Sequence, residues 1–116
     1  MTSLEWECSA DARQMLAAAC NCVTKEALWK LVAVLGRAFC ARTHYTLALA
    51  TEAAEQIASG AGDPVALNNR WFAAFGTGMY LEDAGDAAEE MLEAAHQHLE
   101  PQELADILRQ TLGNPL

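Results

Sequence analysis

The hydrophobic residues of this chain recur with the spacing of helix faces, most clearly between Lys25 and Ser59. Five of them, three or four positions apart, share one side of a helix: Leu28, Leu31, Val32, Leu35 and Phe39. A second apolar face runs from Trp29 to Cys40, and only Gly36 interrupts the segment. The pattern therefore predicts one long central helix, about 52 Å long at about 1.5 Å per residue.

A helix of that length exceeds the core of a domain of this size. It must bend near Gly36 or Arg42–Thr43, or else project from the domain and pair with a second copy. The second alternative is favoured, because the helix is apolar on most sides. The five residues from Leu28 to Phe39 are then expected to supply both the core and the self-association seam of a homodimer.

Shorter apolar patterns divide the rest of the chain. Each of four further helices begins at a capping residue or a proline and ends at a break: about 9–22, 64–75, 80 or 86 to 99, and 101–112. Ahead of them, Leu4 and Trp6 either pack back on the bundle or reach across to a partner. Residues 1–116 are thus expected to form a single all-α domain, a compact bundle of about five helices with one long central helix.

Composition supports helices and excludes several classes of protein. Alanine supplies 24 of the 116 residues and hydrophobic residues 53%, which is typical neither of disordered chains nor of sheets. The net charge of −9 argues against direct binding of nucleic acid. Acids occupy the amino terminus, and no apolar run approaches the roughly 20 residues of a membrane span, so we expect a cytoplasmic protein without membrane contact. The four cysteines are expected to be buried and reduced.

Charge is distributed unevenly along the chain. Residues 1–42 hold five basic and four acidic side chains, whereas residues 43–116 hold two basic and twelve acidic ones. The densest acidic run is Glu82, Asp83, Asp86, Glu89, Glu90 and Glu93. On a helix it forms either a solvated outer face or a docking surface for a basic partner, such as a DNA-binding protein whose nucleic-acid site it imitates.

Residues that carry chemistry are sparse, and no catalytic, cofactor-binding or metal site is predicted. Carboxylate pairs such as Glu89–Glu90 are adjacent on an exposed helix and do not converge as acid–base catalysis requires. Cys20 and Cys22, with His96 and His98, offer the ligand set of a zinc site. Residues two apart on a helix, however, point about 200° away from each other. The chain is therefore expected not to be an enzyme.

The richest aromatic cluster surrounds the turn Gly76–Thr77–Gly78. Most of its side chains are expected to fill the core. Aromatic residues and methionine also dominate binding energies at protein interfaces. The residues predicted to bind a partner are therefore those at this turn: Phe75, Met79, Tyr80 and Leu81.

In size, alanine-rich helicity, acidity and lack of catalytic residues, residues 9–112 resemble the small helical inhibitors of bacteria and their phages. In particular the chain is similar to quorum-sensing antiactivators, which sequester acyl-homoserine-lactone receptors. The resemblance lies in overall properties, so no functional residue is carried over. It implies occlusion of the dimerisation or DNA-binding surface of a transcription regulator. Anti-CRISPR inhibitors, toxin-immunity proteins and a structural helical dimer are the alternatives.

Overall fold

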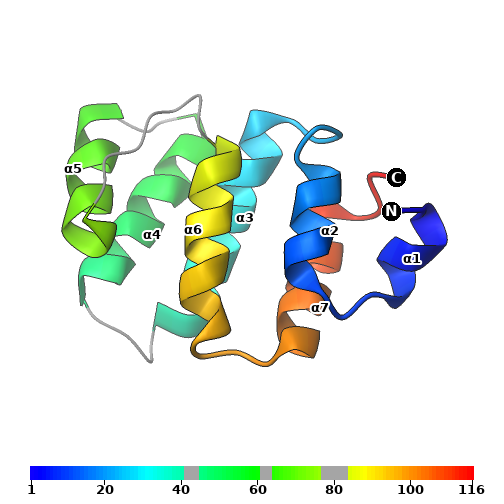
Figure 1. The fold of residues 1–116 in the computed structure, drawn as a ribbon. Helices are drawn as coiled ribbons and strands as arrows, with labels where there is room; N and C mark the ends of the chain where they lie inside the picture. Colours follow the sequence, from blue (N-terminus) through cyan, green and yellow to red (C-terminus); the bar gives the residue numbers. More distant parts are fainter. Residues whose placement is uncertain (41–44, 61–63, 77–83) are drawn as a thin grey trace.

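The computed structural model describes residues 1–40, 45–60, 64–76 and 84–116 (Figure 1). These residues form seven helices: α1 (Ser3–Cys8), α2 (Ala12–Ala19), α3 (Lys25–Cys40), α4 (Tyr45–Ala58), α5 (Pro64–Phe75), α6 (Ala84–His96) and α7 (Pro101–Leu112). No strand is present in the described part of the chain. The predicted all-α class is therefore confirmed, with two more helices than expected.

The prediction of one long central helix is wrong, because the apolar segment from residue 25 to 59 is divided between α3 and α4. These two helices pack against each other (Figure 1). The helix α3 continues through Gly36, one of the two places considered for a bend. The other predicted bend, Arg42–Thr43, lies outside the described residues.

Gly36 instead lies where α3 and α4 are in close contact. A Cβ atom at this position would lie 2.0 Å from Oγ1 of Thr51 and 2.9 Å from its Cγ2. Thr51 is fully buried, and its hydroxyl donates to the carbonyl of Leu47 at 2.8 Å. The one glycine of the segment thus permits two helices to pack where any side chain would hold them apart.

The helix α3 is the centre of the core, with α4, α6 and α7 packed around it. Its five-residue apolar face is buried within a single copy of the chain: Leu28, Leu31, Val32, Leu35 and Phe39. These side chains therefore build the core, and the seam expected for a homodimer is covered by the chain's own helices. The side of α6 opposite its exposed acids is also buried: Ala84, Ala88, Met91, Leu92 and Ala95.

Capping residues set the ends of the shorter helices. The unpredicted α1 begins with a capping box, in which the side chains of Thr2 and Glu5 each accept from the other's backbone N–H. Asp11 caps α2, two residues after the predicted Ser9. Pro64 and Pro101 open α5 and α7 at the predicted positions, because proline suits the first turn of a helix.

The amino-terminal helix α1 is fastened to the carboxyl end of the chain. Trp6 is fully buried, and its Nε1 donates to the carbonyl of Gly113 at 2.7 Å. Arg109 donates to two backbone carbonyls of residues 6–9, at 3.0 and 2.8 Å. Asn114 donates to the hydroxyl of Ser3 at 2.7 Å. We call Trp6, Arg109, Gly113 and Asn114 the α1–α7 clasp; it places the two ends of the chain side by side (Figure 1).

Candidate functional site

Of the four residues predicted to bind a partner, Phe75 lies at the end of α5, and Met79, Tyr80 and Leu81 lie outside the described residues. Phe75 is half-buried, and its ring packs on that of Trp71 with centroids 4.8 Å apart. Phe75 therefore belongs in part to the core.

Trp71 anchors α5 to the rest of the fold. Its side chain is fully buried, and its Nε1 donates to Oε2 of Glu90 on α6 at 2.9 Å. Its ring meets that of Trp29 on α3 edge to face, with centroids 6.3 Å apart. One tryptophan thus joins α5 to two other helices by a hydrogen bond and by ring packing.

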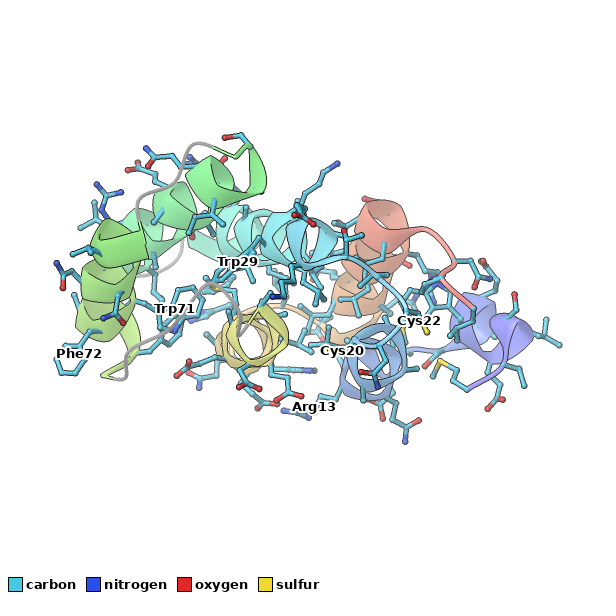
Figure 2. The ribbon with its side chains drawn as sticks, turned by 90° about the horizontal axis from the view of Figure 1, so that it is seen from above. Arg13, Cys20, Cys22, Trp29, Trp71 and Phe72 are labelled. Atoms are coloured by element: carbon cyan, nitrogen blue, oxygen red, sulfur yellow. The ribbon has the colours of Figure 1, made fainter. Side chains whose placement is uncertain are left out.

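The next residue points the other way. Phe72 is 61% exposed, and Figure 2 shows it directed away from the helices while Trp71 is directed toward α6. Val65, two turns earlier, is 68% exposed. With the exposed Asn69 and Ala73, these residues form one side of α5. We call Val65, Asn69, Phe72 and Ala73 the α5 outer face.

Elsewhere in the described chain the large exposed hydrophobic residues lie at the two termini. Leu4, which is 73% exposed, is the one on α1, and Met1 and Leu116 lie outside the helices. Scattered apolar side chains are usual on protein surfaces, whereas neighbouring ones mark interaction sites. The α5 outer face is therefore the best candidate for a protein-binding site in the described residues.

The acidic helix α6 has a more mixed role than predicted. Asp86, Glu89 and Glu93 are exposed, as expected for an outer face. Both carboxylate oxygens of Glu93 accept from the guanidinium of Arg13 on α2. This hydrogen bonding lowers the pKa of Glu93 and raises that of Arg13. Glu90 accepts from Trp71 on α5 in a similar way. Two carboxylates of the acidic run therefore link α6 to other helices.

A groove of about 420 Å³ lies where the end of α2 meets the start of α6, lined in part by Cys20, Lys25 and Asp86. Burial raises the pKa of the Cys20 thiol, and the carboxylates of Glu89 and Asp86 raise it further. The thiol is therefore protonated near neutral pH and is a poor nucleophile. The expectation that all cysteines are buried is wrong for Cys8 and Cys22, which are exposed.

The structure does not bring the cysteine and histidine pairs together. Cys20 lies beside the first turn of α6, since its Sγ is 3.6 Å from where a Cβ of Gly85 would stand. His96 is in the last turn of α6, and the ring of His98 stacks on Phe39 with centroids 5.6 Å apart. In the described residues no three His, Cys, Asp or Glu side chains are grouped to hold a metal ion.

A second open groove, of about 460 Å³, follows the seam between α3 and α4. Its floor is made of Ala33, Val34 and Ala58, and the ion pair between Arg37 and Glu55 closes one end. The groove is open, with small apolar side chains beside Lys30 and the Arg37–Glu55 ion pair. It therefore carries less binding chemistry than the α5 outer face.

The α5 outer face was not predicted from the sequence, although a signal for it was present. Val65 and Phe72 are seven positions apart, which keeps them on one side of a helix, and Trp71 is rotated about 100° from Phe72. Because Trp71, Phe72 and Phe75 are close in sequence, they read as a single core cluster.

None of the described helices is long and apolar enough to cross a membrane. Comparison of the chain with protein-family models, with curated proteins and with solved structures gives no match. The function therefore has to be inferred from the residues of the α5 outer face and their surroundings.

Proposed function

We propose that this chain is a non-enzymatic cytoplasmic regulator that binds another protein through the α5 outer face and inhibits it. The observation that carries the proposal is the exposure of Phe72 and Val65 on one side of a helix whose other side is anchored by Trp71. A large aromatic side chain on a firmly held helix loses little conformational freedom on binding, and such residues dominate interface energies.

The target that the overall resemblance suggests is a transcription regulator, in particular an acyl-homoserine-lactone receptor. Inhibition would follow from occlusion: the chain would cover the surface through which the receptor dimerises or contacts DNA. The acidic composition supports this choice, because DNA-binding surfaces are basic. An anti-CRISPR or toxin-immunity inhibitor would use the same face against a different protein.

The test asks whether the chain releases a purified acyl-homoserine-lactone receptor from its promoter DNA. Release is measured by electrophoretic mobility shift. Wild-type chain at up to about 10 µM should reduce the bound fraction, and Phe72→Ala should require at least about tenfold more protein. Leu4→Ala removes an equally exposed residue on α1 and should behave as wild type.

Full retention of the receptor on DNA at the highest concentration would contradict the quorum-sensing form of the proposal. Affinity purification of tagged chain from its host, compared between wild type and Phe72→Ala, then identifies any other target. Proteins that co-purify equally with both variants do not use the α5 outer face.

A further inference from the structure

The helix α1 is attached to the fold by one buried side chain and by hydrogen bonds to one short segment. Trp6 is its only buried residue. Within the described chain, the hydrogen bonds that α1 and Ser9 make beyond residue 11 all lead to residues 109–114: Trp6 with Gly113, Arg109 with Trp6 and Ser9, and Asn114 with Ser3 and Glu7. Release of α1 therefore breaks no hydrogen bond between the other helices.

The helix at the opposite end of the chain is held differently. The twelve residues of α7 pack against α2, α3 and α6, and three of them are buried: Leu104, Ala105 and Leu108. A terminal element is exchanged between copies at least cost when few contacts have to be broken. Of the two terminal helices, α1 is therefore the one suited to exchange.

A single residue separates two fixed points in the connection between α1 and α2. The carbonyl of Ser9 accepts from Arg109 at 2.8 Å, and the carboxylate of Asp11 caps α2 by accepting from the backbone N–H of Gln14. Ala10 stands between them and is exposed. Because Ser9 and Asp11 already have extended backbone angles, the connection has little slack.

The contacts of α1 are the same whether it docks on its own copy or on a second one. A helix of six residues is not stable alone in water, so a released α1 regains its structure only by docking. Docking on its own copy is favoured by an effective concentration in the millimolar range for a short linker. That concentration falls toward zero when the linker cannot span the two sites, and a second copy then becomes the favoured partner.

We propose that α1 exchanges between two copies of the chain, so that Trp6 of each copy fills the site beside Arg109 and Gly113 of the other. The inference does not depend on the proposed function. It corresponds to the second alternative considered for Leu4 and Trp6, in which they reach across to a partner, and it identifies that partner as a second copy. The dimer forms at the α1–α7 clasp, at the opposite end of the fold from α5 (Figure 1).

The test shortens the connection by deletion of Ala10 from the full chain. The deletion removes about 3.5 Å of reach, so one copy cannot keep both the bond to Ser9 and the cap at Asp11. At about 100 µM, light scattering should show wild type chiefly as a monomer and at least about half of the shortened chain as a dimer. This corresponds to a Kd at least about 20-fold below the millimolar value expected for wild type.

Three variants of the shortened chain separate exchange of α1 from other modes of association. Trp6→Ala should abolish the dimer, because it removes the one side chain that α1 buries. Leu4→Ala and Phe72→Ala remove exposed apolar residues from α1 and α5, and each should change the Kd less than about twofold. Hydrogen exchange should show residues 3–8 protected in the dimer, and circular dichroism checks that the helices are retained.

Three outcomes would overturn the inference: a helical shortened chain that stays monomeric, a dimer in which residues 3–8 are unprotected, and a dimer that persists in Trp6→Ala. If the shortened chain loses its helices, wild type at about 2 mM replaces it, and at least about a tenth of the chains should be dimeric there. Absence of that dimer, or its persistence in Trp6→Ala, would equally contradict exchange. No target protein is used, so the result is separate from that of the proposed function.

Discussion

The helices α1 and α5 lie at opposite ends of the fold, and each buries one tryptophan beside an exposed apolar residue. In α1 these are Trp6 and Leu4, and in α5 they are Trp71 and Phe72. The helix α1 is held by hydrogen bonds to the carboxyl-terminal segment, which form the α1–α7 clasp. The helix α5 is held by packing on α4, by ring contacts and by one bond to α6.

The difference shows that exposure of an apolar residue does not by itself identify a binding site. The six residues of α1 present Leu4 alone, on a helix whose neighbouring polar groups bond within the chain. The twelve residues of α5 extend over three turns, so two large apolar side chains project from one side. A regular helix of sufficient length can present several exposed residues on one side, so that they form a continuous surface.

The largest expected effects come from removing the two buried tryptophans. Trp6→Ala and Trp71→Ala should each lower the free energy of unfolding by about 3–5 kcal/mol, because each leaves a large cavity and removes a hydrogen bond between helices or to the carboxyl-terminal segment. Chemical denaturation measures the loss, and hydrogen exchange locates it. Faster exchange should be concentrated in α1 for Trp6→Ala and in α5 for Trp71→Ala. Equal acceleration at both ends in either variant would show that the two helices do not open independently.

Gly36→Ala should cost about 1–3 kcal/mol, since the new methyl group overlaps Thr51 and forces α3 and α4 apart. This loss outweighs the roughly 1 kcal/mol that alanine gains over glycine in helix propensity. Thr51→Ala in the same chain should restore part of the stability, because Oγ1 and Cγ2 are removed whereas Cβ, at 2.9 Å, remains. The steric explanation would be excluded if the double variant lost more free energy of unfolding than the two single variants lose in sum.

Phe72→Ala should change the free energy of unfolding by less than about 0.5 kcal/mol, as should Leu4→Ala, because both side chains face solvent. Thermal denaturation followed by circular dichroism measures both. The comparison between the two ends then depends on binding alone, where only Phe72→Ala is expected to matter. A substantial loss of stability in Phe72→Ala would place this ring in the core.

The smallest expected effect is the response to acid of Asp106, which pairs with Arg109 of the α1–α7 clasp. Hydrogen bonds from Arg109 and Gln102 lower the pKa of Asp106 below its ordinary value of 3.8. Its ionised form therefore contributes stability above pH 3.8, and this contribution is lost as pH falls through the lowered pKa. Asp106→Asn should lower Tm by less than about 3 °C at pH 7, and the difference between variant and wild type should disappear toward pH 2. A difference between wild type and variant that persists at pH 2 would have another cause.

Several features of the fold could be predicted from particular residues. Proline fixes its own backbone angle and suits the first turn of a helix, so Pro64 and Pro101 identified the starts of α5 and α7. The period of the apolar residues identified the buried side of α3. These predictions succeed because each depends on local geometry.

The other features depend on contacts between segments that are distant in sequence. The division between α3 and α4 was considered at Arg42–Thr43 but not favoured, because residues 41–44 contain no proline or glycine and the apolar spacing resumes at Tyr45. Six residues are too few for a helical period to reveal α1, although Thr2 and Glu5 form a readable capping box. The α5 outer face was missed because only the packing of Trp71 on α3 and α6 decides which side of α5 is exposed.

The bonds from Asn114 to Ser3 and Glu7 bring the two ends of the described chain together on the side away from α5. A short peptide linker would therefore join residues 1 and 116 without crossing the fold, which is the geometry that circular permutation requires. For the same reason a loop of a carrier protein would accept residues 1–116 as an insertion. Both attachment points would then lie beside α1 and α7, and the α5 outer face would be displayed at the far end of the fusion.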